Sequence, residues 1–151
     1  MIITDALAQF LITAKKNTYA AGITENVVDD AKESVYEQDE YSYKDRYYGT
    51  SQFSGEEIVK ENGVVIWSMN YYGGLLVNNV EEGKINTFLK KALLKVPLDI
   101  PFRGPKKFID KDFKYENNVS GNIRNFKGTE CIFYKKIKVY SLEYHGGIIK
   151  N

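Results

Sequence analysis

The sequence predicts an α+β fold in which an α-β-β-β unit occurs twice, giving a mainly antiparallel sheet with two helices on one face around a pseudo-twofold axis. The first observation is a repeat, because residues 53–74 and 126–147 align over 22 positions with seven identities. The second is that a helical pattern precedes the strand patterns in each half. We therefore expect a single domain over residues 1–151, with repeat halves at about 4–76 and 81–149.

In the first half, apolar residues recur at helical spacing over residues 4–17, with Thr4 or Asp5 available as an N-cap. Residues 23–40 are polar and acidic without a clean period, which predicts a long loop. Tyrosines alternate with polar residues over 41–49 and predict a strand. Two further strands are expected at 57–60 and 64–72, joined by a hairpin at Glu61-Asn62-Gly63.

In the second half, residues 81–95 again carry apolar side chains at helical spacing, and Pro97 and Pro101 end the pattern. A strand is predicted from Phe113 to just before Gly121. Residues 130–134 and 137–144 then form a hairpin across two lysines. Each half thus follows the order helix, strand, strand, strand.

Composition excludes several classes of function. The net charge is +1 with only three arginines, which argues against a nucleic-acid-binding surface. The longest apolar run, residues 64–67, is too short to span a bilayer, and the N-terminal pattern is that of an amphipathic helix, so we expect a cytoplasmic protein without a membrane partner. One histidine and one cysteine disfavour a zinc site, and we predict neither metal nor cofactor.

Because side chains on a strand alternate between two faces, the last strand of each half can be sorted. Trp67, Met69 and Tyr71 form the side expected against the helices. The opposite side is semi-polar in both halves, and it is either an ordinary solvent-facing surface or a ligand groove. If the twofold axis brings the two strands together, four of its residues line one shared concavity: Asn70, Tyr72, Glu143 and His145.

Three further groups of residues are candidates for a binding or catalytic role. Arg103 lies in the turn Phe102-Arg103-Gly104-Pro105, from which an arginine can clamp an anionic group. Glu57 and Glu130 are equivalent in the repeat and either flank the axis, to bind a cation or share a proton, or bond the preceding turn. Beside Glu143, His145 is the only candidate imidazole base, but no nucleophile accompanies it. We assign no catalytic residue.

Six motifs occur in order along nearly the whole chain: Ala14-Lys15-x-x-Thr18-Tyr19-Ala20, Tyr47-x-Gly49, Phe53-x-Gly55-Glu56-Glu57, Trp67-x-Met69-Asn70-Tyr71-x-Gly73, Phe102-Arg103-Gly104-Pro105 and Tyr144-His145-Gly146-Gly147. Together they resemble a bacterial domain family of unknown function that occurs alone or C-terminal to Xre-type helix-turn-helix domains. That resemblance implies no established activity, and we expect a stand-alone copy. The paired units also resemble, at the level of fold, the duplicated gyrase-inhibitor-like effector domains, which bind small molecules at a pseudo-twofold axis.

The expected function is a small-molecule-binding or sensing domain, rather than an enzyme, with its ligand groove between the two halves. The 12 tyrosines favour such a recognition surface. The candidate ligand-binding residues are Trp67, Asn70, Tyr72, Arg103, Glu143 and His145. Two alternatives remain open at this point. One is a protein-interaction module, such as an antitoxin, immunity protein or phage-derived inhibitor, and the other is a small hydrolase or isomerase using His145 and Glu143.

Overall fold

A computed structural model describes residues 3–18, 20, 25–78 and 81–151 of the chain. Within these residues the chain forms two helices, α1 (Ile3–Lys16) and α2 (Glu82–Leu93), and nine strands. The strands are β1 (Asn26–Val28), β2 (Ala31–Gln38), β3 (Tyr41–Gly49), β4 (Gln52–Glu61), β5 (Val64–Leu75), β6 (Lys107–Asp110), β7 (Phe113–Asn122), β8 (Asn125–Tyr134) and β9 (Ile137–Ile148).

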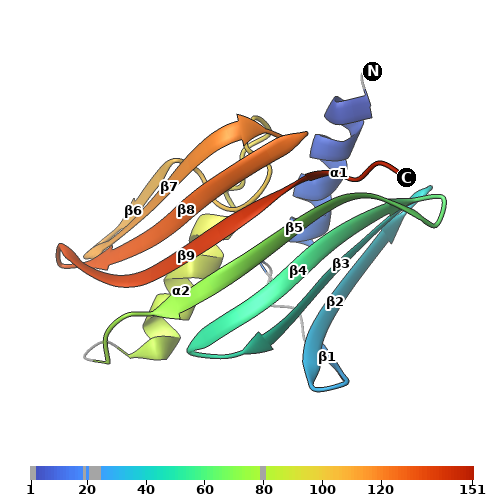
Figure 1. The fold of residues 1–151 in the computed structure, drawn as a ribbon. Helices are drawn as coiled ribbons and strands as arrows, with labels where there is room; N and C mark the ends of the chain where they lie inside the picture. The colour runs from blue at the N-terminus through green and yellow to red at the C-terminus, as the bar shows by residue number, and fades with distance from the viewer. Residues whose placement is uncertain (1–2, 19, 21–24, 79–80) are drawn as a thin grey trace.

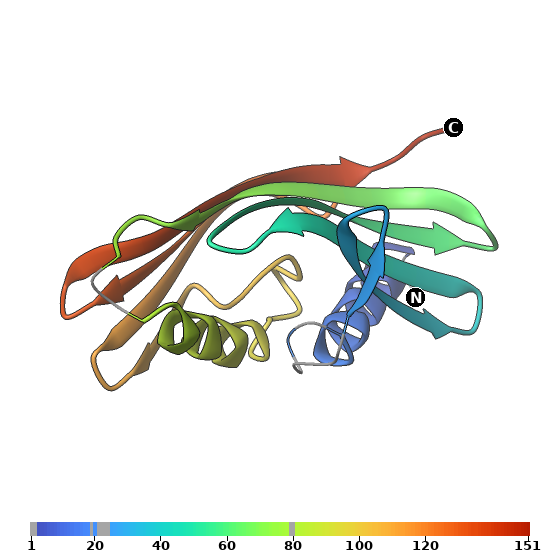
Figure 2. The same cartoon turned by 90° about the horizontal axis from the view of Figure 1, so that it is seen from below.

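The strands form one open sheet in the order β1-β2-β3-β4-β5-β9-β8-β7-β6, and every neighbouring pair is antiparallel (Figure 1). Seen from below, the sheet arches over α1 and α2, so both helices lie on its concave side (Figure 2). The segment between α2 and β6 also runs on this side, between the two helices. The mainly antiparallel sheet with two helices on one face is therefore as predicted.

Both helices follow the predicted apolar stripes. In α1 the residues Leu7, Leu11 and Ala14 are fully buried, since positions three and four apart share one helix face. In α2 the buried face comprises Ile85, Phe88, Leu89, Ala92 and Leu93. The helix α1 already includes Thr4 and Asp5, so the predicted caps lie in its first turn instead.

The predicted hairpins form where residues tolerate a positive φ. Asn62 and Gly63 have φ values of 50° and 83° and join β4 to β5. Lys135 and Lys136 have φ values of 47° and 69° and join β8 to β9. The strand predicted over residues 41–49 is β3. Local turn chemistry therefore predicted these connections correctly.

The loop predicted over residues 23–40 is wrong for the described part, which contains β1 and β2. Asp29 and Asp30, with φ values of 49° and 65°, turn the chain between these strands. The neighbouring strand supplies a partner for one charged side chain of β2, since Glu33 accepts a 2.9 Å hydrogen bond from Arg46. The strand β6 was also missed. The predicted unit of three strands per helix is therefore corrected to five strands after α1 and four after α2.

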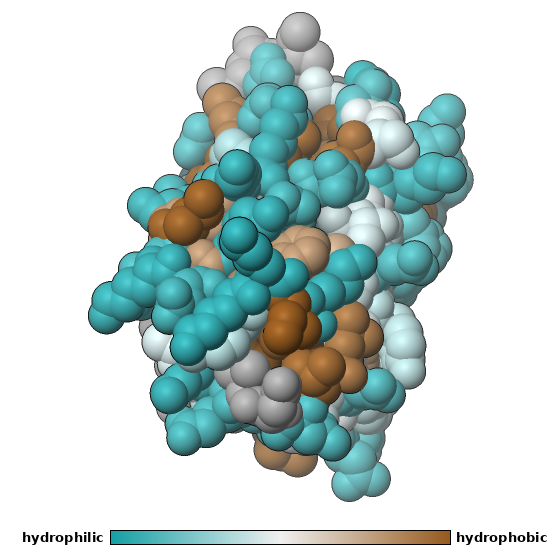
Figure 3. Space-filling view, turned by 90° about the vertical axis from the view of Figure 1, so that its left-hand side faces the viewer, coloured by the Kyte–Doolittle hydropathy of each residue, from teal (hydrophilic) through white to brown (hydrophobic). Residues whose placement is uncertain are grey.

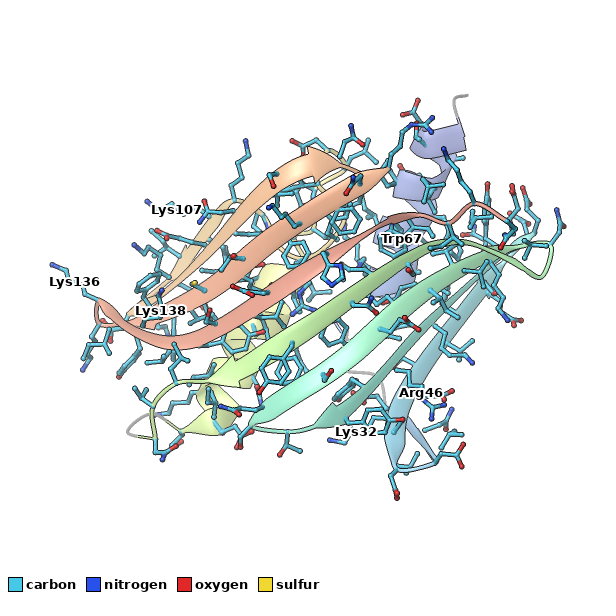
Figure 4. The ribbon with its side chains drawn as sticks, viewed as in Figure 1. Lys32, Arg46, Trp67, Lys107, Lys136 and Lys138 are labelled. Atoms are coloured by element: carbon cyan, nitrogen blue, oxygen red, sulfur yellow. The ribbon has the colours of Figure 1, made fainter. Side chains whose placement is uncertain are left out.

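Aromatic rings fill the space between the sheet and the segment that follows α2. The Phe102 and Phe126 rings stack with centroids 3.7 Å apart, and Trp67 stacks on the other side of Phe126 at 5.7 Å. Figure 4 shows Trp67 on the part of the sheet that lies in front of α1. This stack attaches residues 102–105 firmly to the sheet, which decides where Arg103 lies.

Candidate functional site

The strands β5 and β9 meet in the middle of the sheet, where Tyr71 lies directly opposite Tyr144. Because side chains alternate, the residues on either side of these tyrosines face outward, away from the helices. Asn70 lies opposite His145, and Tyr72 lies opposite Glu143. These two cross-strand pairs are the four residues that the sequence analysis grouped on one face.

The four residues line a hollow of about 940 Å³ on the outer face, which we call the outer trough; its floor also includes residues of β4, β7 and β8. All four side chains are exposed, and Tyr72 retains 61% of its surface. Water competes for every hydrogen bond that an exposed group offers, so the open trough is a less favourable setting for selective binding than an enclosed site of similar chemistry. The structure thus brings the predicted residues together, in an open setting.

The other two predicted residues lie elsewhere. The Trp67 side chain is fully buried on the inner face, where it belongs to the aromatic stack. Arg103 is 4% exposed, and its Nε and Nη2 donate hydrogen bonds to Glu130 at 3.0 and 2.8 Å. The expectation that Arg103 closes over an anion beside the outer face is corrected, because packing of Phe102 against the sheet turns the arginine inward.

Each of the two repeat-equivalent glutamates forms its own buried ion pair. Lys15 of α1 bonds Glu57 and also donates to the Phe102 carbonyl at 2.7 Å. Burial lowers the pKa of Lys15, and the Glu57 charge opposes that shift. Glu130 pairs with Arg103 and also accepts a hydrogen bond from the Tyr140 hydroxyl at 2.8 Å. Three separate sequence motifs thus meet in one buried network.

Asp45 is the acidic residue of this network that faces open space. It is 4% exposed, and its Oδ1 accepts a 2.6 Å hydrogen bond from the Tyr71 hydroxyl. Burial, and after it the neighbouring Glu57 charge, raise the pKa of Asp45 from 3.8 to about 7. The hydrogen bond from Tyr71 and the charges of Lys15 and Arg103 act in the opposite direction. A carboxyl group poised near neutral pH beside a cavity is typical of functional sites.

The space beside Asp45 is a cavity of about 280 Å³ between α2 and strands β3 to β5, which we call the inner pocket. Its charged, polar, aromatic and large apolar lining residues are Glu25, Lys32, Asp45, Tyr47, Thr50, Phe53, Tyr71, Glu82, Asn86, Leu89, Lys90, Leu93 and Arg103. Leu89 and Phe53 supply apolar walls, whereas Asn86 of α2 is exposed at the mouth. Lys32 of β2, the strand beside β3, also lines the pocket and is labelled in Figure 4. The pocket combines an apolar wall with a few convergent polar groups, as small-molecule sites do.

Sequence reasoning missed Asp45 although a signal was present. Along β3 it occupies the same alternation as Tyr43 and Tyr47, whose rings face the inner side. An aspartate in the core-facing phase of a strand is costly unless it is bonded or functional. That mismatch between residue type and strand face is the signal by which Asp45 could have been found from the sequence.

The end of the molecule at the β8–β9 turn is shown in Figure 3. Hydrophobic residues gather there in separate patches between hydrophilic side chains. Exposed apolar residues at this end include Leu76 and Ile137, at 53% and 54% exposure.

Among the residues that the structure describes, no group of three His, Cys, Asp or Glu side chains is placed to hold a metal ion. Neither α1 nor α2 is long and apolar enough to cross a membrane.

Comparison with curated proteins and comparison with solved structures each found no match. A family model for a domain of unknown function, DUF5680, matches residues 45–149. The match begins at Asp45 and covers both buried glutamates, Arg103 and the β5–β9 junction. The chain therefore belongs to the DUF5680 family of domains of unknown function.

Proposed function

We propose that the chain is a small-molecule-binding domain whose ligand occupies the inner pocket. The observation that carries this proposal is the position of Asp45, a buried carboxyl group at the wall of a 280 Å³ cavity. Buried charges rarely increase stability compared with apolar residues of the same size, so a retained one favours a binding or catalytic role. The cavity is close to the lower end of the usual ligand-site range, about 300 Å³, which suits a small metabolite.

A proposed duplication of the two halves supports the same assignment. Tyr71 and Tyr144 are equivalent in the sequence repeat and lie opposite each other across the β5–β9 junction. The Tyr71 hydroxyl bonds Asp45, and the Tyr144 hydroxyl bonds Asn117 at 2.7 Å. We infer that a pseudo-twofold axis passes near the two tyrosines, so that Asp45 and Asn117 correspond.

The two corresponding positions differ in what covers them. The amide of Asn117 donates a 2.9 Å hydrogen bond to the Gly104 carbonyl, so residues 102–105 pack onto it. Asp45 instead lines the inner pocket. In this proposal one copy keeps a structural amide and the other carries the ligand-binding carboxyl group. In this proposal the functional difference between the two halves is that between Asp45 and Asn117. It is not the difference between the outer-face residues Asn70 and Tyr72 and their counterparts Glu143 and His145.

A sensing role is part of the same proposal. The motifs resemble a bacterial family found beside Xre-type helix-turn-helix domains, and a ligand-binding domain beside a DNA-binding domain typically acts as an effector sensor. This resemblance favours binding without turnover.

The outer trough is a second candidate ligand site. It is favoured by the direct facing of Asn70 with His145 and of Tyr72 with Glu143 across β5 and β9. Tyr72 is 61% exposed and offers a flat ring with a hydroxyl group, a combination common at recognition surfaces. A ligand bound there would lie over the junction of the two halves.

A thermal-shift screen of metabolites and nucleotides, followed by calorimetry of the hits, tests these sites. Asn86→Trp places a large side chain at the mouth of the inner pocket, and Tyr72→Ala removes the exposed ring of the outer trough. We expect hits to be lost in Asn86→Trp and retained in Tyr72→Ala. The opposite pattern would move the site to the outer trough, and an absence of any saturable binder would refute the proposed function.

A further inference from the structure

We propose that the inner pocket selects ligands that carry a protonated amine, with Asp45 and Glu25 as its acceptors. This inference rests on the proposed function, because it assigns a chemical class to the ligand of the same pocket. It is carried by three features of the pocket wall: two carboxyl groups, a row of aromatic rings, and the pairing of nearby cations with other partners.

The two carboxyl groups are held in place by tyrosine hydroxyls. Tyr71 donates to Asp45 at 2.6 Å, and Tyr47 donates to Oε1 of Glu25 at 2.9 Å. The second oxygen of Glu25 is buried and has no hydrogen-bond partner. A buried acceptor without a donor is unfavourable. An ammonium group brings three donors and a positive charge, so its hydrogen bonds to carboxylates are stronger than those of a neutral donor, whereas an anionic group is repelled.

Aromatic rings form the adjacent wall. The Tyr47 and Phe53 rings meet edge to face with centroids 6.2 Å apart, and the Phe53 and Tyr71 rings meet in the same way at 6.0 Å. Ring faces attract cations, and more strongly where water is excluded. The Lys32 ammonium already lies 5.5 Å from the centroid of Tyr47. This wall therefore has the electrostatic character that an alkylammonium ligand requires.

The charged and titratable groups around Asp45 include, besides its immediate neighbours, Lys32 of β2 and Glu82 and Lys90 of α2, which also line the pocket. Glu57 faces Asp45 from β4 and Tyr71 from β5, while Lys15 approaches from α1 and Arg103 from the segment after α2. Lys15 and Arg103 are committed to ion pairs with glutamates, Lys15 with Glu57 and Arg103 with Glu130, whereas Lys32 lies over the Tyr47 ring. The ammonium group of a bound ligand would therefore be the cation that pairs with the Asp45 carboxylate.

Amine binding should depend on pH in a defined direction. Burial raises the pKa of Asp45 to about 7, so below this pH a cation must displace the proton of the carboxyl group. We expect affinity for an amine to rise between about pH 6 and pH 8, by up to about tenfold per pH unit below the pKa of Asp45. A matched neutral compound should bind equally at both pH values.

The test uses three probes of one shape and different charge: benzylammonium, benzyl alcohol and benzoate. Binding to the full chain at pH 8 is followed by NMR titration. We expect benzylammonium to bind about tenfold more tightly than benzyl alcohol, as one charge-assisted contact allows. Asp45→Asn should remove this preference, because Asn117 shows that an amide accepts the same tyrosine hydrogen bond. Asp99→Asn, an exposed loop substitution of equal charge change, should retain it.

Glu25→Gln provides a second test at a half-buried position, should Asp45→Asn fail to fold. We expect it to weaken benzylammonium binding by about threefold or more while leaving benzyl alcohol unchanged. Equal or tighter binding of benzoate or benzyl alcohol by the wild-type chain overturns the amine inference, and so does wild-type affinity in both acidic variants. Compounds that bind in an Asn86-dependent manner without an amine preference leave the proposed function standing. Absence of any binder overturns both.

Discussion

Asp45 lies directly opposite Glu57 on adjacent antiparallel strands, and both side chains face the buried side of the sheet. Their exposed fractions are 4% and 0%. Two carboxyl groups placed together in a buried environment disfavour simultaneous ionisation. Burial first, and then the charge of Glu57, raise the pKa of Asp45, whereas Glu57 itself is bonded to Lys15. Such an arrangement reduces stability near neutral pH, which is expected of a binding site rather than of a structural core.

The first prediction concerns Asp45 and pH. Its pKa is raised from 3.8 to about 7 on folding, so the folded state binds the proton more tightly. The stabilisation is therefore complete below about pH 4 and is lost as pH rises to about 7, at no more than about 1.4 kcal/mol per pH unit. Asp45→Asn should abolish this dependence and be more stable than wild type at pH 8 by about 1–3 kcal/mol.

Urea denaturation of both proteins between pH 4 and pH 8 checks this prediction, with Asp99→Asn as the exposed control. The quantity to compare is the difference in the free energy of unfolding between variant and wild type at each pH. A difference that stays constant across this range would contradict the raised pKa of Asp45.

The second prediction concerns the Tyr71–Asp45 hydrogen bond. Tyr71→Phe removes the donor, and the loss should cost more at pH 8, where Asp45 is ionised, than at pH 5, by about 1 kcal/mol. Tyr144→Phe is the matched control, because its acceptor Asn117 does not titrate. Its cost, measured by chemical denaturation, should be the same at both pH values, and equal pH behaviour of the two variants would refute the argument.

The third prediction concerns the buried ion pair of Arg103. Arg103→Met leaves Glu130 buried without its bidentate partner and should destabilise the protein by about 3–5 kcal/mol. Arg103→Lys keeps the charge but loses the two-point fork, so an intermediate loss is expected. Thermal and urea unfolding measure both effects. A loss below about 1 kcal/mol for Arg103→Met would show that Glu130 finds another partner or becomes neutral.

The fourth prediction concerns two glycines that lie beneath tyrosine rings. A Cβ atom at Gly55 would lie 2.4 Å from Cζ of Tyr71, and one at Gly128 would lie 2.2 Å from Cζ of Tyr144. Alanine at either position should therefore displace the ring and cost about 1–3 kcal/mol. Gly83→Ala in α2 is the control, since its Cβ meets nothing within 4 Å and the change should stabilise the helix by up to about 1 kcal/mol. Comparable melting temperatures for all three variants would contradict this account.

Elements with a strong local pattern were predictable. The apolar stripe of α1 and α2 and the positive-φ turn at Asn62-Gly63 depend on residues close in sequence, so their structure follows from local rules. The strands β1 and β2 were not predictable in this way. Their charged side chains look like a loop until a neighbouring strand pairs with them, as Arg46 of β3 does with Glu33.

The candidate site likewise contains residues whose positions were predictable from the sequence and residues whose positions were not. Alternation along β5 and β9 correctly grouped Asn70, Tyr72, Glu143 and His145 on one outward face, because strand periodicity is a local property. Alternation along β3 likewise places Asp45 on the same side as Tyr43 and Tyr47, which is the side that packs inward. The residues around Arg103 do not indicate whether its side chain is exposed or buried, because the same turn sequence is compatible with either position.

The sequence by itself determined the helical faces, the hairpins and the two sides of each long strand, since these depend on backbone geometry and on residues a few positions apart. Only the tertiary structure decided that Lys15 meets Glu57, that Arg103 meets Glu130, and that Asp45 lines a pocket beneath α2. These contacts join residues from distant segments. Their energies come from burial and charge compensation, and both arise only once the sheet has packed against the two helices.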